Sequence, residues 1–200
     1  NVVSKGQPIQ FTDLNTRLLK DLGALEIGVK ASALKHPHAF KSLLIPKLRE
    51  RPEVFSLMSN TVTLTSLKSE TNIVNLIPGA TTALLDCRLL PSTDRNKFLS
   101  DFKKKLDNDS IEISVVYEMP PIMPSSDTTK FYKAMDKAIQ TIYPDAAIIP
   151  LILPNFNDVG IFRSQGIPCY SSFPIQLDLE HMMHIHNYNE SIPVASLNKG

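Results

Sequence analysis

Leucines in the first part of the chain recur at helical spacing. They fall on one face of a predicted amphipathic helix and are Leu14, Leu18, Leu19, Leu22 and Leu25. Gly23 and Gly28 limit how far this helix can continue, because glycine disfavours a helix interior. A shorter helix is predicted from His38 to Leu48, with a break at Pro52. The opening part of the chain is therefore predicted to be helical.

The pattern then changes from helical spacing to alternation. In residues 61–65 apolar residues alternate with threonines, which favours a half-buried strand, and a second strand is predicted over residues 81–90. Residues 92–94 can cap a following helix, whose apolar positions are Phe98, Leu99, Phe102 and Leu106. Alternation at Ile111, Ile113, Val115 and Tyr117 predicts a third strand with one buried face.

The order helix, strand, strand, helix, strand predicts most of a split βαβ unit of the ferredoxin-like kind, an α+β fold that lacks only its first strand. That strand would lie before residue 1 or in the ambiguous opening residues. A sheet with helices on one face would bury the apolar positions of these elements. The first predicted domain, residues 1–120, is therefore a two-layer ferredoxin-like domain.

A proline-rich connector over residues 119–124 marks a natural domain boundary. Beyond it the pattern becomes α/β. A helix is predicted on the apolar positions Phe131, Met135, Ala138, Ile139 and Ile142. It is followed by a buried strand at 147–153, a short helix at 158–164, a strand at 167–172 and a helix beginning at Ser191. Residues 121–200 therefore form the second predicted domain.

Composition indicates an ordinary globular protein. Hydrophobic residues make up 42% and charged residues 20% of the chain, and the net charge is +1. This balance gives no electrostatic reason to expect nucleic acid or a membrane surface as partner. Cys87 and Cys169 show no paired spacing, which favours reduced thiols and a cytoplasmic protein. The chain opens with Asn1 and not Met, which indicates a piece of a longer protein that could have lost a leader.

Three of the five histidines crowd into one segment as His181, His184 and His186. Imidazole is a common zinc ligand, so this segment can be a small metal site, can supply a lone ligand, or can be a polar loop without metal. In an extended chain His184 and His186 would point to the same face and His181 to the other. The two remaining histidines, His36 and His38, flank a proline and are interpreted as surface residues.

Four ordered segments resemble one zinc-dependent family. They are residues 75–78 (Asn-Leu-Ile-Pro), 86–91 (Asp-Cys-Arg-Leu-Leu-Pro), 157–168 (Asn-Asp through Gly-Ile-Pro) and 185–190 (Ile-His through Asn-Glu). The family contains glutamate carboxypeptidase, acetylornithine deacetylase, succinyl-diaminopimelate desuccinylase and the yeast vacuolar carboxypeptidase S. The resemblance covers residues 60–200. One departure is that residues 153–156 lack the family's glycines, which leaves the substrate class open.

The resemblance implies roles for individual residues. His186 matches a zinc ligand of the family, while Glu190 would cap the final helix. Asn75 and Arg88 match residues that hold the substrate carboxylate, a task suited to a planar guanidinium. The alternative for Arg88 is a surface strand residue paired with Asp86, and for Asn75 a residue that supports a turn.

The resemblance also implies what the chain would need from elsewhere. The family's two zinc ions require a His-x-Asp pair and a Glu-Glu pair, which this sequence does not contain. The chain would thus be a fragment, inactive alone, of a homodimeric exopeptidase or N-acyl amino acid amidohydrolase. The parent would cleave an amide bond beside a free carboxylate, in a small peptide or an N-acyl amino acid. The alternatives are a non-catalytic dimerisation or ligand-binding module and a small metal-storage site on the three clustered histidines.

Overall fold

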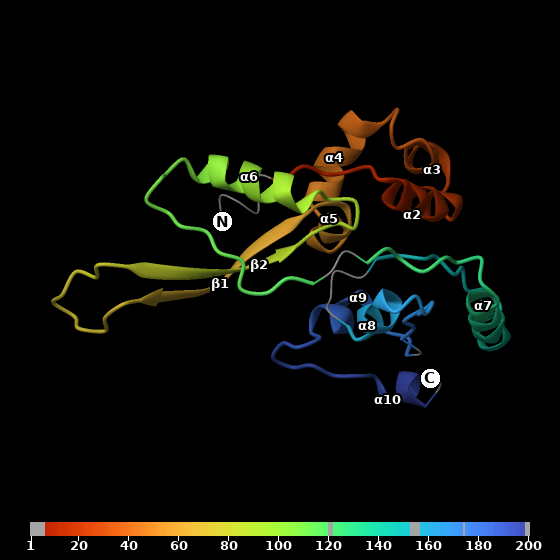
Figure 1. Ribbon diagram of the computed structural model, residues 1–200. Helices are drawn as coiled ribbons and strands as arrows, with labels where there is room; N and C mark the ends of the chain where they lie inside the picture. The colour runs from red at the N-terminus through yellow and green to blue at the C-terminus, as the bar shows by residue number, and fades with distance from the viewer. Residues whose placement is uncertain (1–6, 120–121, 153–156, 174, 199–200) are drawn as a thin grey trace. The chain divides into compact units, whose positions relative to one another are not determined.

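A computed structural model describes residues 7–119, 122–152, 157–173 and 175–198 of the chain (Figure 1). The chain divides into two compact units, Asn1–Asp158 and Val159–Gly200, and each is described by itself. Parts of four predictions lie outside the described residues: the opening strand, the prolines at 120 and 121, the segment at 153–156, and the end of the last helix. In the described ranges no helix is both long enough and apolar enough to cross a membrane.

The first unit opens with helices, as predicted. They are α2 (Asp13–Ala24), α3 (Gly28–Lys35), α4 (Lys41–Arg49) and α5 (Pro52–Met58). Thr12 caps α2 by accepting a hydrogen bond from the backbone N–H of Asn15 at 3.2 Å. Pro52 does not simply interrupt the chain, since it occupies the first turn of α5, where its missing N–H costs nothing.

These helices enclose a small hydrophobic core. Its buried members are Leu19, Ala33, Leu44, Leu48 and Met58. Helices α2 and α3 approach closely at Gly23, where an added Cβ would lie 2.8 Å from the Cβ of Leu34. Glycine is therefore required there by packing and does not merely end a helix.

A long antiparallel hairpin follows, formed by β1 (Thr61–Ser69) and β2 (Thr81–Arg88). Thr61 lies opposite Arg88, and Ser69 lies opposite Thr81. The register shifts between Leu64 and Ser66, so Thr65 is the extra residue of a β-bulge. Because of this bulge the side chain of Leu67 lies on the same face of the hairpin as those of Val62 and Leu64.

Asn60 joins the two ends of the hairpin. Its side-chain Oδ1 accepts hydrogen bonds from the Leu90 backbone N–H at 2.9 Å and from the Thr93 hydroxyl at 2.8 Å. Asn60 is 5% exposed and Leu90 is 7% exposed, so the hydrogen bond between them has little access to water. Helix α6 (Arg95–Leu106) begins immediately afterwards, and Asp94 caps it by accepting from the Lys97 N–H at 2.9 Å. The predicted cap in residues 92–94 is thus confirmed at Asp94.

The rest of the chain contains short helices and extended segments. The helices are α7 (Lys130–Ile142), α8 (Val159–Ser164), α9 (Leu179–Met183) and α10 (Val194–Leu197). Their positions confirm the helices predicted after residues 130, 158 and 191.

Three predicted strands do not form. Residues 111–117, 147–152 and 167–172 have no regular structure, and the sheet of the described residues contains β1 and β2 alone. A segment forms a strand only where a neighbouring strand supplies hydrogen bonds, and among the described residues no strand pairs with these segments. The mixture of helices with a small antiparallel sheet is α+β, as predicted.

A matched pair of leucines in α4 tests the core. Leu44 is 7% exposed and belongs to the core, whereas Leu43 is 52% exposed. Leu44→Ala is expected to lower the free energy of unfolding by about 2–4 kcal/mol, because it leaves a cavity. Leu43→Ala, with the same change in helix propensity, is expected to cost less than about 1 kcal/mol. Urea denaturation followed by circular dichroism measures both, and equal losses would contradict the assignment of the core.

The Asn60 junction can be tested in the same assay. Asn60→Leu removes the acceptor and leaves the buried Leu90 N–H unpaired, so it is expected to cost about 1–3 kcal/mol. Thr93→Val removes one donor and leaves the Leu90 bond intact, so its expected cost is smaller. The reverse order would show that Asn60 does not act through the Leu90 hydrogen bond.

Candidate functional site

The structure places two candidate site residues, Asn75 and Arg88, on the β1–β2 hairpin. Arg88 is the last residue of β2, at the base, whereas Asn75 lies in the loop that joins the strands at the far end (Figure 1). From Thr81 to Arg88 the strand advances seven residues (88 − 81), about 23 Å at the usual rise of ~3.3 Å per residue. One chain therefore does not bring these two side chains to a single carboxylate.

Arg88 already contacts a carboxylate. Its Nε and Nη2 both donate to Oδ2 of Asp86, at 3.1 and 3.0 Å. The two residues are neighbours on one face of β2, and the side chain of Arg88 is 51% exposed. An exposed pair of this kind adds less than about 1 kcal/mol to stability. Asp86 orients the guanidinium, so a second carboxylate would meet an arginine that already contacts one.

Asn75 lies in a turn of the 70–80 loop. The turn is closed by a hydrogen bond from the Leu76 N–H to the Ile73 carbonyl at 3.2 Å. Glu70 closes the base of the loop, because its Oε2 accepts from the Ala80 N–H at 3.1 Å. Asn75 itself is exposed at the tip, with aliphatic residues on both sides in the sequence.

His186 lies in the second unit, in a turn that follows α9. Its φ is 62°, and Asn189 in the same turn has a φ of 63°. Histidine and asparagine tolerate this left-handed region better than most residues, although it remains costly for any side chain. The turn presents the imidazole at the surface, since His186 is exposed.

Asp178 is a residue that sequence reasoning missed. It caps α9 by accepting a hydrogen bond from the His181 backbone N–H at 2.9 Å, and its Oδ1 also lies 2.7 Å from His181 Nδ1. These two contacts, the backbone one first, lower the pKa of the Asp178 carboxyl. An aspartate three residues before a histidine was the available signal, because that is the spacing of an N-cap. A carboxylate on Nδ1 leaves Nε2 as the outward-facing nitrogen of His181.

A complete metal site does not form within the part of the chain that the structure describes. No group of three or more histidine, cysteine, aspartate or glutamate side chains converges there. The three clustered histidines therefore do not assemble the small metal-storage site that was one interpretation of the sequence. The residues present do not fit a zinc centre by themselves, and His186 can be at most one ligand of a larger one.

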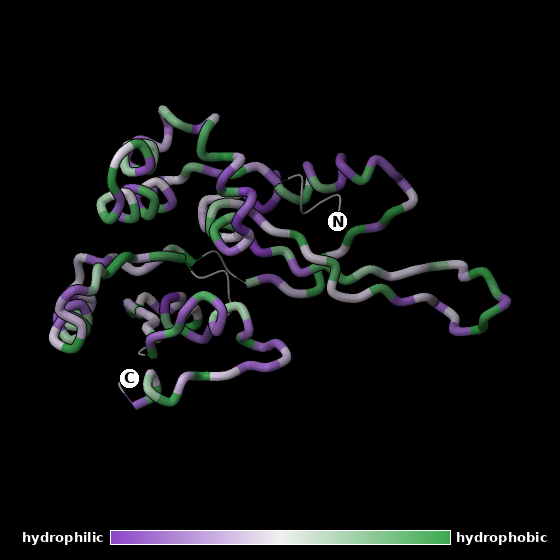
Figure 2. Tube along the Cα trace, turned by 180° about the vertical axis from the view of Figure 1, so that it is seen from behind, coloured by the Kyte–Doolittle hydropathy of each residue, from purple (hydrophilic) through white to green (hydrophobic). Residues whose placement is uncertain are grey.

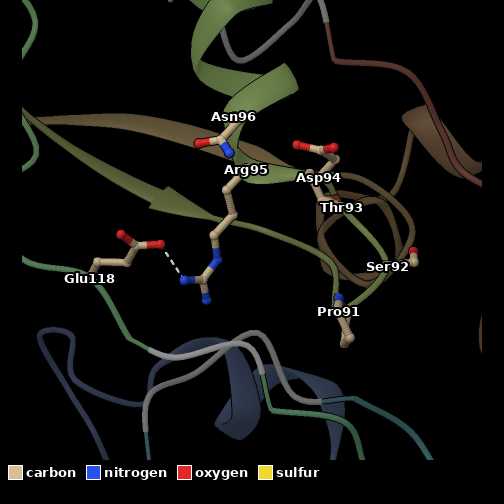
Figure 3. Close-up of a pocket in the computed structure, with 7 residues that line it drawn as sticks. All are labelled: Pro91, Ser92, Thr93, Asp94, Arg95, Asn96 and Glu118. Atoms are coloured by element: carbon tan, nitrogen blue, oxygen red, sulfur yellow. Dashed lines mark hydrogen bonds and ion pairs between the residues drawn. The ribbon is translucent and has the colours of Figure 1, made fainter.

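A hollow lies elsewhere, at the beginning of α6 (Figure 3). It has a volume of about 430 Å³ and is lined by Pro91, Ser92, Thr93, Asp94, Arg95, Asn96 and Glu118. The guanidinium of Arg95 is paired with Glu118 and also donates to the Met119 carbonyl. None of the candidate site residues Asn75, Arg88 and His186 lines this hollow, and the one cation in its lining, Arg95, is already engaged.

Comparison with known proteins connects the hairpin to a family. Residues 16–114 match the peptidase dimerisation domain. Over 156 residues the chain is 24% identical to the N-fatty-acyl-amino acid synthase/hydrolase PM20D1 of Mus musculus, covering 76% of this chain and 31% of that protein. Over 183 residues it is 22% identical to the probable carboxypeptidase S-like 2 of Dictyostelium discoideum, covering 90% and 35%. The chain thus spans about a third of the length of these curated relatives. No solved structure matches it.

The Asp178 cap provides a test by pH. Because its pKa is lowered in the folded chain, the cap is complete above the ordinary pKa of an aspartate, about 3.9, and is lost as the pH falls through the lowered value. The NMR shift of the His181 amide should therefore change with a midpoint below about 3.9. In Asp178→Asn, which keeps a capping oxygen without a titrating group, that change should disappear. A midpoint at or above the ordinary value would contradict the capping contact.

Proposed function

We propose that the chain is the subunit-pairing lid of a metal-dependent hydrolase, followed by the closing part of its catalytic domain. The reason is that residues 16–114 match the peptidase dimerisation domain. The lid comprises residues 1–120 and the catalytic segment residues 121–200. In this proposal the lid is ferredoxin-like, and residues 111–117 become a strand once a neighbouring strand pairs with them. We also propose a cytoplasmic location, because Cys87 and Cys169 show no paired spacing in the sequence.

The proposed reaction is hydrolysis of an amide or peptide bond next to a free carboxylate. Water adds across the bond, the C–N bond breaks, the hydroxyl goes to the acyl carbon and a proton goes to the amine. The family match over residues 16–114 carries this proposal, and the names of the relatives, a synthase/hydrolase of N-fatty-acyl amino acids and a carboxypeptidase-like protein, agree with it. The substrate would be an N-acyl amino acid or a small peptide.

Helix α7 supports the assignment of the second segment to a larger domain. Its apolar residues fall on one face, yet none of its residues is buried. Phe131 and Ile142 on that face are 59% and 64% exposed. A strongly amphipathic helix normally buries such a face against a core. The proposed catalytic domain would provide that core.

Dimerisation gives the two hairpin residues a way to act together. In the described residues β1 and β2 pair only with each other, so each has one edge open to a further strand. If two copies pair antiparallel about a two-fold axis, the hairpin tip of one protomer lies toward the hairpin base of its partner. Asn75 and Arg88 would then hold one substrate carboxylate from two different chains. We propose a homodimer of this kind.

His186 would supply one imidazole to the metal centre of the parent enzyme, which in this family holds two zinc ions. The remaining ligands are not among the described residues, and this chain alone is expected to be inactive and to bind zinc weakly. This same observation favours a second candidate, a dimerisation or ligand-binding module that has no catalytic centre.

Subunit complementation tests the proposal in the full-length protein that contains this chain. Asn75→Ala and Arg88→Ala should each raise the KM for an N-acyl amino acid tenfold or more, because each removes one side of the carboxylate site. When the two variants are mixed and re-associated, random pairing should restore about a quarter of the wild-type activity, because half of the dimers are mixed and each has one intact site of two.

The controls separate the alternatives. Mixing two preparations of Arg88→Ala should restore nothing. If the wild type hydrolyses the substrate but the mixed variants do not regain activity, the shared site is contradicted. If the wild type dimerises but hydrolyses no N-acyl amino acid, the non-catalytic module is favoured.

A further inference from the structure

The loop at the hairpin tip is aliphatic and carries no charge. Ile73, Val74, Leu76 and Ile77 are 60%, 103%, 54% and 91% exposed. From Thr71 to Leu85 the sequence contains no charged residue. Figure 2 shows the loop that joins the two strands as partly hydrophobic, at the end of the hairpin. Neighbouring exposed aliphatic side chains of this kind mark an interaction surface.

The loop itself keeps these side chains on the outside. Glu70 and Ala80 exchange two contacts, since the Glu70 N–H donates to the Ala80 carbonyl at 3.1 Å and the Glu70 carboxylate accepts from the Ala80 N–H. Thr71 Oγ1 accepts from the Ile73 N–H at 3.1 Å. These polar residues satisfy the backbone at the start of the loop and close its base. The aliphatic side chains are therefore not needed to close the loop and remain available for a ligand.

Charge and position together select the kind of ligand. An anionic membrane surface attracts lysine and arginine, but the tip has neither, and its nearest charged side chain is the acidic Glu70. Asn75 lies between two aliphatic residues on each side in the sequence, and its amide can donate two hydrogen bonds. A polar donor surrounded by aliphatic groups complements a molecule with a carboxylate next to a long hydrocarbon chain.

We propose that the aliphatic tip, Ile73, Val74, Leu76 and Ile77, binds the hydrocarbon chain of an N-acyl amino acid substrate and selects long acyl groups over short ones. This inference rests on the proposed function, in which Asn75 contacts the carboxylate of the same substrate. Affinity should rise with chain length, because each methylene transferred from water to an apolar surface adds to binding. The tip would thus be a specificity element and not part of the machinery that cleaves the bond.

The test uses this chain with ¹³C-labelled isoleucine, leucine and valine methyl groups. N-dodecanoylphenylalanine, kept below its micelle concentration, should shift the methyl signals of residues 73, 74, 76 and 77 saturably, whereas N-acetylphenylalanine should not. The double variant Val74→Ser, Ile77→Ser should weaken binding of the dodecanoyl compound at least tenfold. The matched control Leu67→Ser, which changes a 65% exposed leucine on β1, should change it less than twofold.

Three results would overturn the inference. One is the absence of shifts at the tip, or equal shifts at Leu67 and the tip. The second is the same shifts with phosphatidylserine vesicles and no acyl amino acid, which would assign the tip to a membrane. The third is a loss of the dodecanoyl-induced shifts at protein concentrations where the chain is dimeric, which would show that a second copy of the chain covers the tip and excludes the ligand.

Hydrolysis separates this inference from the proposed function. If the full-length protein hydrolyses N-acetylphenylalanine but the tip methyl groups do not shift with the dodecanoyl compound, only the inference fails. If neither compound is hydrolysed and the tip methyl groups still shift saturably, the tip site stands and the proposed function fails.

Discussion

The hairpin depends on one buried amide. Asn60 precedes β1, and the two groups that donate to its side-chain oxygen, the Leu90 N–H and the Thr93 hydroxyl, follow β2. A single residue therefore fastens both ends of the hairpin and determines where α6 can begin. Since Asn60 is buried, water cannot easily replace these bonds if the junction opens. Both hairpin candidates, Asn75 and Arg88, lie between these two fastened ends, on β2 or in the loop that joins it to β1.

The length of the hairpin then constrains any chemistry. Arg88 lies at the fixed base, beside Asp86, and Asn75 lies in the loop at the opposite end. Two side chains separated by the length of a strand cannot grip one small ligand within one chain. Either their roles are independent, or a second subunit brings a tip to a base. Residues 16–114 match the peptidase dimerisation domain, and the proposed homodimer is an arrangement of the second kind.

Sequence reasoning predicted the elements whose signals are local. Helices α2, α6 and α7 follow from apolar spacing, and the cap of α6 was predicted within residues 92–94. The structure finds caps at Thr12, Asp94 and Thr129. The two hairpin strands were also predicted, and they form because each supplies hydrogen bonds to the other. Residues 111–117 carry an equally clear alternation, but a strand needs a second segment to pair with, and in the described part of the chain none pairs with this one.

The candidate site was predictable only in part. Motif resemblance identified Arg88, Asn75 and His186, but motif order along the chain carries no distances. It could not decide between a substrate role for Arg88 and the alternative pairing with Asp86, which the structure shows, and it could not show that His186 adopts a left-handed backbone. Asn60 was missed because its importance comes from buried contacts that form only in the folded chain, whereas Asp178 was missed although its spacing before His181 is that of an N-cap.

The extra residue at Thr65 shifts the alternation of side chains along β1 by one position. Before it, Val62 and Leu64 define the apolar face. After it, the alternation resumes one residue late, so that Leu67 joins that face and Lys68 leaves it. The effect of a deletion in β1 thus depends on how many residues are removed. Deletion of Thr65 alone would remove the bulge and leave both faces unchanged, because Ser66 would follow Leu64 and keep Leu84 as its partner. Deletion of one further residue of β1 would exchange the two faces over the outer half of the hairpin.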